Sequence, residues 1–185
     1  MTITERAGDG AEYTRILNAI YALIGGGAAV DLGCGEAHTT KNWPMCTLVD
    51  LVQRASADRW IEALDIRLAP ALFAREQRKY NLTVISDVIE HLTRADGDKL
   101  IADMEPITKA MFIFTPIGPY KLDENSKDPD VHKSAWTPEE FEALGWQVWA
   151  WPNYHPFVGS FYAWKWNNAV TPSVDIVAKA ARVAV

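Results

Sequence analysis

The sequence has little cysteine, no long apolar run and no excess of positive charge. Its two cysteines, Cys34 and Cys46, show neither a CxxC pair nor the spacing of metal ligands, so we expect two reduced thiols in a cytoplasmic protein. No apolar run is long enough to cross a bilayer, and the opening MTITERAGDG is too polar for a secretory signal. A formal net charge of −6 offers no general attraction to nucleic acid, so neither a membrane nor a nucleic acid is the expected partner.

The length and composition are those of one globular domain. The 185 residues suffice for a full hydrophobic core, and the hydrophobic and charged fractions, 49% and 23%, are ordinary for a soluble protein. The sequence contains no internal repeat and no low-complexity segment. We therefore expect a single domain over 1–185, in which 169–185 is a C-terminal tail that forms one amphipathic helix.

The segment AAVDLGCGE is the clearest functional signal. The apolar run Ala28–Leu32 predicts a short buried strand, and Gly33 and Gly35 follow it at once. Glycines allow a sharp turn and a close approach of a ligand, and open α/β sheets bind ligands at the carboxyl ends of their strands. A dinucleotide fits poorly, because its G-x-G-x-x-G fingerprint needs a third glycine where this chain has His38. A nucleoside without phosphates, such as S-adenosylmethionine with its positive sulfonium, suits Asp31 better.

Two further predicted strands lead into acidic residues. Met45–Leu51 ends near Asp50, whose carboxylate can accept both hydroxyls of a ribose; a solvated acid at a strand end is the alternative. Trp60–Leu64 is a candidate third strand that leads into Asp65, which can equally be the N-cap of the next helix. That helix is predicted over Leu68–Tyr80, with basic residues in its last turns.

The segment DVIEHL follows the predicted fourth strand, Leu82–Ser86. If the chain becomes helical there, Asp87, Glu90 and His91 stand at positions i, i+3 and i+4 and share one face. Two carboxylates and an imidazole on one face can hold Mg²⁺ or Mn²⁺. They can equally form a hydrogen-bonded cluster that shapes a cofactor pocket.

A long irregular segment follows the predicted fifth strand, Met111–Thr115. Pro116–Trp136 has little periodicity, and a loop of this length in a compact domain is usually functional. Because it leaves the carboxyl end of a strand, it can act as a lid over the cofactor, and it contains His132. The helix after it has a clear start, since Thr137 and Glu140 have the spacing of a capping box.

Aromatic residues are concentrated in the last third of the chain. Six of the eight tryptophans lie from Trp136 onward, and most of them fall in the predicted strands Trp146–Trp151 and Phe157–Trp166. They can form a platform for a flat substrate, or they can be buried between the strands and the helices, which is the commoner outcome.

VDLGCGE and DVIEHL together resemble motifs of the class I, seven-strand, S-adenosylmethionine-dependent methyltransferases. The resemblance covers about 12–166 and leaves only the tail outside. It implies an α/β fold, a doubly wound three-layer α/β/α sandwich whose seven-strand sheet is mostly parallel. Its last strand, Phe157–Trp166, would be antiparallel and insert between the fifth and sixth. One departure is Ala37, where many members have a third glycine.

The resemblance also implies the contacts to the cofactor. By this likeness Asp65 accepts a hydrogen bond from the adenine amine, Ile66 packs on the ring and Asp50 holds the ribose. The expected residues that bind S-adenosylmethionine are Asp31, Gly33, Cys34, Gly35, Asp50, Leu51, Asp65, Ile66, Ser86 and Asp87.

DVIEHL and the later HKSAWTPEEF are similar to two metal-using branches of the family, the small-RNA 3′-terminal 2′-O-methyltransferases and the ubiquinone-pathway O-methyltransferases. This likeness implies that Asp87, Glu90, His91 and His132 bind Mg²⁺ or Mn²⁺, with Asp87 in place of a longer Glu. The same loop also looks like that of small methyltransferases of sugar or polysaccharide modification, which have no such metal. In that case His132 and His91 are the candidate catalytic bases.

The expected function is methyl transfer from S-adenosylmethionine to an oxygen nucleophile of a small-molecule or glycan acceptor. Three alternatives stay open: a non-catalytic protein that binds S-adenosylmethionine, a metal-dependent RNA 2′-O-methyltransferase, and an NAD-dependent oxidoreductase, which His38 disfavours.

Overall fold

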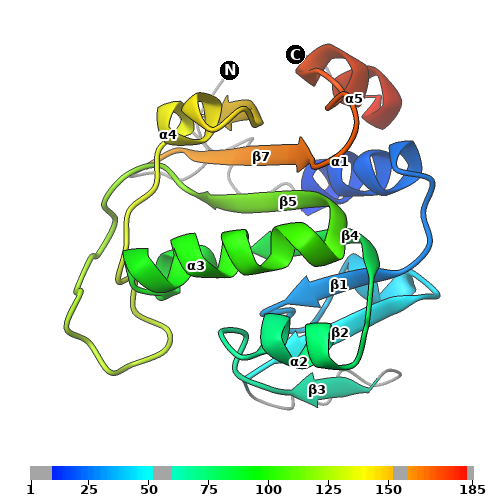
Figure 1. Ribbon diagram of the computed structural model, residues 1–185. Coiled ribbons are helices and arrows are strands. Elements are labelled where there is room, and N and C mark those ends of the chain that lie inside the picture. Colours follow the sequence, from blue (N-terminus) through cyan, green and yellow to red (C-terminus); the bar gives the residue numbers. More distant parts are fainter. Residues whose placement is uncertain (1–9, 52–59, 152–157, 183–185) are drawn as a thin grey trace.

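The computed structural model describes residues 10–51, 60–151 and 158–182, which form a seven-stranded sheet flanked by helices (Figure 1). The strands are β1 (Ala29–Leu32), β2 (Cys46–Asp50), β3 (Ile61–Ala63), β4 (Tyr80–Ser86), β5 (Thr108–Pro116), β6 (Gln147–Trp151) and β7 (Ser160–Trp166). The α-helices are α1 (Gly10–Leu23), α2 (Ala69–Arg75), α3 (Arg94–Met104), α4 (Pro138–Ala143) and α5 (Val174–Ala181). The 3₁₀ turns within these residues are η2 (Thr40–Asn42), η3 (Ile89–His91) and η4 (Glu105–Ile107).

The strand order is β3-β2-β1-β4-β5-β7-β6. β1 to β5 pair in parallel, and β7 runs antiparallel between β5 and β6. This confirms the predicted α/β sandwich and the insertion of the last strand between the fifth and the sixth. Because the chain order reverses between β1 and β4, the carboxyl ends of these two strands lie side by side where open α/β sheets bind ligands.

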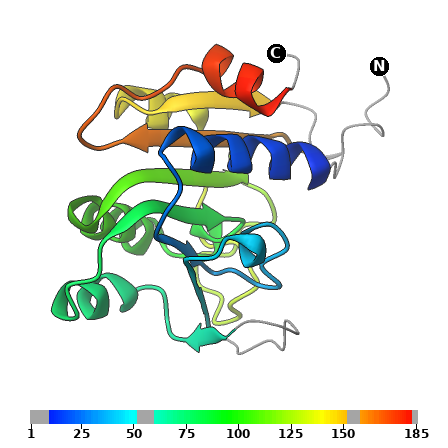
Figure 2. The same ribbon diagram turned by 90° about the vertical axis from the view of Figure 1, so that its right-hand side faces the viewer.

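Helices cover both faces of the sheet. α2, α3 and α4 pack on one face, and α1, η2 and α5 pack on the other (Figures 1 and 2). Successive residues of a strand point to opposite faces, so Val84 and Phe112 face the side of α1, whereas Ile85 and Met111 face the side of α3. Burial on both faces explains why the central strands are almost continuously apolar.

The predicted helix Leu68–Tyr80 is wrong at its C-terminal end. Helix α2 ends at Arg75, the chain then reverses through Gln77 with a φ of +56°, and Tyr80 already belongs to β4. Arg78 therefore lies outside the helix. Its guanidinium donates to a carboxylate oxygen of Glu62 on β3 at 2.7 Å, so it joins two elements instead of complementing a helix dipole.

The C-terminal segment contributes to the core. Helix α5 forms inside the predicted tail and packs against α1, with Val177, Ala178 and Ala181 buried in the same apolar cluster. The indole N–H of Trp164 donates to the Pro172 carbonyl at 2.7 Å and fixes the approach to the helix. Within the described residues, the apolar core thus extends beyond 166.

Burial accounts for the tryptophan-rich segment. From Trp136 onward, five of the six tryptophans are less than 10% exposed: Trp136, Trp146, Trp149, Trp151 and Trp164. They pack between strands and helices, so they offer no open platform. Among the described residues, no helix is long and apolar enough to cross a membrane.

Candidate active site

The turn after β1 has the geometry of a ligand-binding turn. Gly33 and Gly35 have φ values of +75° and +51°, which side chains rarely allow. A Cβ at Gly33 would lie 2.4 Å from Cγ2 of Val88, so the turn after β1 and the turn after β4 are in direct contact. The Gly35 N–H donates to Asp50 Oδ2 at 2.8 Å and ties the turn to the end of β2. Gly33, Gly35 and Asp50 are therefore brought together, as the sequence predicted.

Asp31 and Cys34 lie at the same turn. The Asp31 carboxylate is buried and accepts a hydrogen bond from the Thr40 hydroxyl at 2.6 Å. Burial raises the pKa of Asp31 to about 6. Burial, with the charges of Asp31 and Asp50, also raises the pKa of the Cys34 thiol to about 12, so this cysteine stays protonated and unreactive at neutral pH.

The remaining predicted cofactor residues lie around this turn at the strand ends. Leu51 is exposed just after β2, and Ser86 is the last residue of β4. Asp65 accepts hydrogen bonds from Arg67, which lowers its pKa, and Ile66 is buried against the face of α2. The proposed adenine contacts of Asp65 and Ile66 stay predictions, and in the structure Arg67 is the partner of this carboxylate.

The segment after β4 is not an α-helix, so the predicted shared face of Asp87, Glu90 and His91 is wrong. Asp87 has a φ of +52° and is exposed, and only residues 89–91 form a 3₁₀ turn, η3. Asp87 precedes this turn, and its left-handed backbone breaks the α-helical spacing that would place it on one face with Glu90 and His91. Asp87 is therefore not one of the convergent ligands that Glu90 and His91 provide.

Glu90, His91 and His132 do come together. Their ligand atoms all lie within 4.8 Å of one another, and the two imidazole rings meet edge to face with centroids 4.8 Å apart. Glu90 is 3% exposed and accepts a hydrogen bond from the Thr115 hydroxyl at 2.9 Å. Burial, reinforced by the charge of Asp87, raises the pKa of Glu90 to about 8. Three of the four predicted metal ligands therefore converge.

These three side chains fit a divalent cation. A carboxylate and two imidazoles suit Mn²⁺ well and Mg²⁺ less well. His91 Nδ1 is buried without a hydrogen-bond partner among the described residues, and burial lowers the pKa of His91, so the ring is neutral at pH 7 and can donate a lone pair. The ligand atoms of the three side chains lie at most 4.8 Å apart. Two ligand atoms on opposite sides of Mg²⁺ are expected about 4.2 Å apart, which is close to this distance.

The long loop holds His132 in place through its returning arm, which lies beside the N-terminal end of α3 in Figure 1. The backbone N–H groups of Lys133 and Ser134 both donate to the Glu90 carbonyl, at 2.7 and 3.0 Å. The Lys133 ammonium also donates to the His91 carbonyl at 3.2 Å. Lys133 and Ser134, the two residues after His132, are therefore both hydrogen-bonded to η3. These bonds fix the position of His132 beside His91.

Solved structures show the fold, although no model of a known protein family and no curated protein sequence matches the chain. The methyltransferase domain of the bacterial Hen1 protein CtHen1 superposes with a TM-score of 0.57 and 17% identity, over 83% of this chain and 96% of that one. The N-methyltransferase NodS of Bradyrhizobium japonicum WM9, in complex with S-adenosylhomocysteine, gives 0.55 and 16% over 89% and 91%. The N-terminal domain of EvdMO1, in the presence of S-adenosylhomocysteine and D-fucose, gives 0.58 and 12% over 86% and 83%.

The chain has the class I methyltransferase fold. Two further residues of the candidate site, Thr115 and Val88, were not predicted from the sequence. Thr115 is fully buried at the end of β5 and holds the Glu90 carboxylate. A hydroxyl between apolar neighbours in MFIFTP is a weak sequence signal for such a role. Val88 lies inside DVIEHL, and only the three-dimensional structure shows that it covers Gly33.

If Asp50 holds the ribose as predicted, Asp50→Ala should weaken binding of S-adenosylhomocysteine by about 1–3 kcal/mol. The substitution removes the predicted charge-assisted hydrogen bonds to the ribose and also the observed hydrogen bond from the Gly35 N–H. The fold should persist, because Asp50 lies at a strand end. Isothermal titration calorimetry measures the change, with Asp175→Ala on the surface of α5 as the control. Unchanged affinity would place the ribose contact elsewhere.

Proposed function

We propose that this protein transfers the methyl group of S-adenosylmethionine to a hydroxyl oxygen of a small-molecule or glycan acceptor. The contact between Gly33 and Val88 carries the proposal, because it makes the cofactor turn continuous with the segment that bears Glu90 and His91. His132 completes that group from the loop. Groups suited to bind a cofactor and groups suited to activate a hydroxyl therefore adjoin at the same edge of the sheet.

Methyl transfer is an in-line displacement at carbon. A C–O bond forms, the C–S bond breaks, and its electron pair leaves with the sulfur, which becomes neutral. The hydroxyl proton must go to a base, and without a bound ion the imidazoles of His132 and His91 are the candidates. A divalent ion on Glu90, His91 and His132 would lower the pKa of a hydroxyl bound to it. The chain's own part is to orient the acceptor and to take or release its proton.

The charge of the protein and the ligands of its structural neighbours support this acceptor class. EvdMO1 was crystallised with D-fucose, whereas the Hen1 neighbours include a small-RNA methyltransferase. The net charge of −6 disfavours a polyanion, so a sugar or another small hydroxylated molecule is the better candidate. The two free cysteines agree with the proposed cytoplasmic location.

Transfer of radiolabelled methyl groups tests the proposal. The protein is incubated with labelled S-adenosylmethionine and Mn²⁺ against a panel of monosaccharides, glycans, phenols and small RNAs. Gly33→Val, which is expected not to bind the cofactor, is the inactive control. We expect label on a hydroxyl of a sugar or small molecule. Label on RNA alone would favour the 2′-O-methyltransferase alternative. Binding of the cofactor without transfer to any acceptor would instead support a non-catalytic binding protein.

A further inference from the structure

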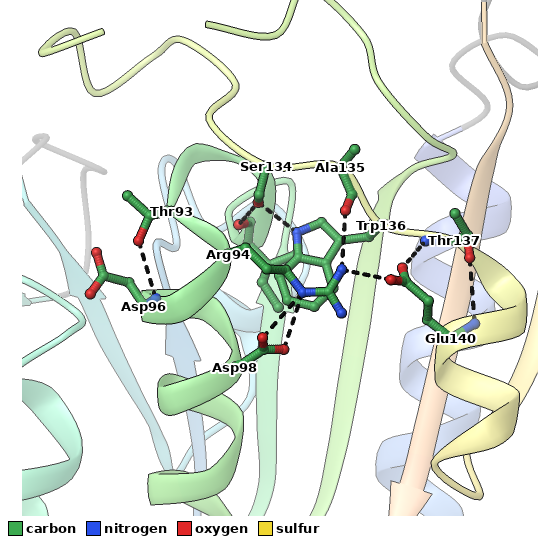
Figure 3. A network of polar contacts seen from close by, with 10 residues as sticks. Thr93, Arg94, Asp96, Asp98, Ser134, Ala135, Trp136, Thr137 and Glu140 are labelled. Atoms are coloured by element: carbon green, nitrogen blue, oxygen red, sulfur yellow. Dashed lines mark hydrogen bonds and ion pairs between the residues drawn. The ribbon is translucent and has the colours of Figure 1, made fainter. Parts of the chain in front are cut away.

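Arg94, the first residue of α3, is the centre of a network that joins three elements (Figure 3). Its guanidinium carbon lies 4.0 Å from the centroid of the Trp136 ring. Its Nη1 donates to a carboxylate oxygen of Glu140 at 2.8 Å and to the Ala135 carbonyl at 3.4 Å, and its Nε donates to Asp98 at 3.2 Å. Arg94 therefore connects α3 to the end of the long loop and to the start of α4.

Trp136 is clamped from two sides. The residue is 2% exposed, and the guanidinium of Arg94 lies over its ring. Gly97 on α3 leaves the room for it, since a Cβ at this glycine would lie 2.6 Å from Trp136 Cζ2. The indole N–H donates to the Ser134 hydroxyl at 2.8 Å, and this hydroxyl donates to the Ile89 carbonyl at 3.2 Å. The clamped ring thus holds Ser134 against η3.

Ser134 is two residues after His132. Its backbone N–H and that of Lys133 bind the Glu90 carbonyl, so whatever fixes Ser134 also fixes the approach of His132 to His91. We propose that Arg94 is a positioning residue for His132, which it holds in the Glu90–His91–His132 group through Trp136 and Ser134. This inference rests on the proposed function, in which His132 acts on the acceptor.

The chemistry of arginine suits this role. Its planar guanidinium can stack on an indole and, at the same time, donate in its own plane to a carbonyl and a carboxylate. Glu140 shares its two oxygens between Arg94 and the Thr137 N–H of the capping box, so the start of α4 is held by the same group. The ion pairs of Arg94 with Asp98 and Glu140 are partly exposed and contribute little stability by themselves. The main restraints are therefore the stacking on Trp136 and the hydrogen bond to the Ala135 carbonyl.

Hydrogen exchange of the Lys133 and Ser134 amides tests the positioning without any ligand. In Arg94→Met we expect both to exchange about tenfold faster or more, which corresponds to about 1.4 kcal/mol in local opening, while the amides of β4 and β5 keep their protection. Lys99→Met is the matched control, because it removes only the exposed ion pair with Asp103 on the same helix. Unchanged exchange at Lys133 and Ser134, or acceleration shared equally by β4 and β5, would overturn the proposal.

Mn²⁺ binding connects the positioning to the site. We expect Arg94→Met to raise the Kd for Mn²⁺, followed by electron paramagnetic resonance, about tenfold, and Arg94→Lys to give a smaller increase because it keeps the charge but not the planar stack. If Arg94→Met does not fold, Arg94→Lys carries both measurements. If the unmodified protein and His132→Ala bind Mn²⁺ equally, the metal-assisted form of the proposed function fails, and the exchange result still decides the role of Arg94.

Discussion

Gly33→Val is expected to abolish binding of S-adenosylmethionine and S-adenosylhomocysteine. At a φ of +75° a β-branched side chain is strained, and its Cβ would lie 2.4 Å from Val88 Cγ2, so the turn must move. The new side chain would also fill the space at the strand end where the cofactor is proposed to lie. A thermal shift assay with millimolar S-adenosylhomocysteine measures the effect: the unmodified protein should be stabilised by the ligand and the variant should not.

A control separates backbone strain from loss of the site. Gly145→Val carries a comparable conformational penalty at a φ of +80°, but it lies after α4, and a Cβ there meets no atom within 4 Å. It should lower the melting temperature without reducing the ligand shift. Because Val88 is the clashing neighbour, Gly33→Ala with Val88→Ala should bind better than Gly33→Ala alone. If the unmodified protein itself shows no shift, S-adenosylmethionine is not its cofactor.

The features that depend only on neighbouring residues were predicted correctly from the sequence. The capping box of Thr137 and Glu140 forms as expected, with both reciprocal hydrogen bonds present, because it depends only on residues three apart. The glycine turn after β1 also formed where predicted. The antiparallel position of β7 between β5 and β6 was predicted from the family resemblance. No pattern within Ser160–Trp166 specifies which strands it pairs with.

The wrong predictions concern positions where tertiary contacts override local pattern. The residues after Arg75 look helical, but Tyr80 pairs with Thr108 and starts β4, so the chain must reverse first. Asp87 takes a left-handed conformation, which removes it from the group it was predicted to join. The convergence of His132 on His91 depends on hydrogen bonds across more than 40 positions of the chain, and no short motif specifies them.

Removal of a divalent metal is expected to abolish turnover. With a bound ion, EDTA should abolish methyl transfer to a genuine acceptor, and Mn²⁺ or Mg²⁺ should restore it. Glu90→Gln should lose metal binding and turnover together, whereas the control Glu139→Gln, on the exposed side of α4, should lose neither. Because Asp87 lies outside the convergent group, Asp87→Asn should keep more of the metal affinity than Glu90→Gln does.

The pH dependence follows from the buried carboxyl. Glu90 has a pKa of about 8 in the folded, metal-free protein and an ordinary value of 4.5, so the folded state binds more protons between these values. The contribution of Glu90 to the stability of the metal-free protein should therefore fall as pH rises from about 4.5 to 8. Glu90→Gln should remove this contribution and leave the smaller fall that comes from Asp31, whose pKa is also raised by burial. Metal needs the ionised carboxylate, so affinity for Mn²⁺ should rise toward pH 8 with release of a proton, a rise that Glu90→Gln also removes.

The alternative without metal makes the opposite prediction. EDTA would leave turnover unchanged, and His132 would act as the general base, so His132→Ala would flatten the acidic limb of the pH–rate profile. Glu90 would then stay largely protonated at neutral pH as a hydrogen-bonded support, and Glu90→Gln would be nearly neutral for turnover. If neither chelation nor His132→Ala changes turnover, both mechanisms are wrong. Catalysis would then rest on positioning alone, with an acceptor nucleophilic enough to react without a base.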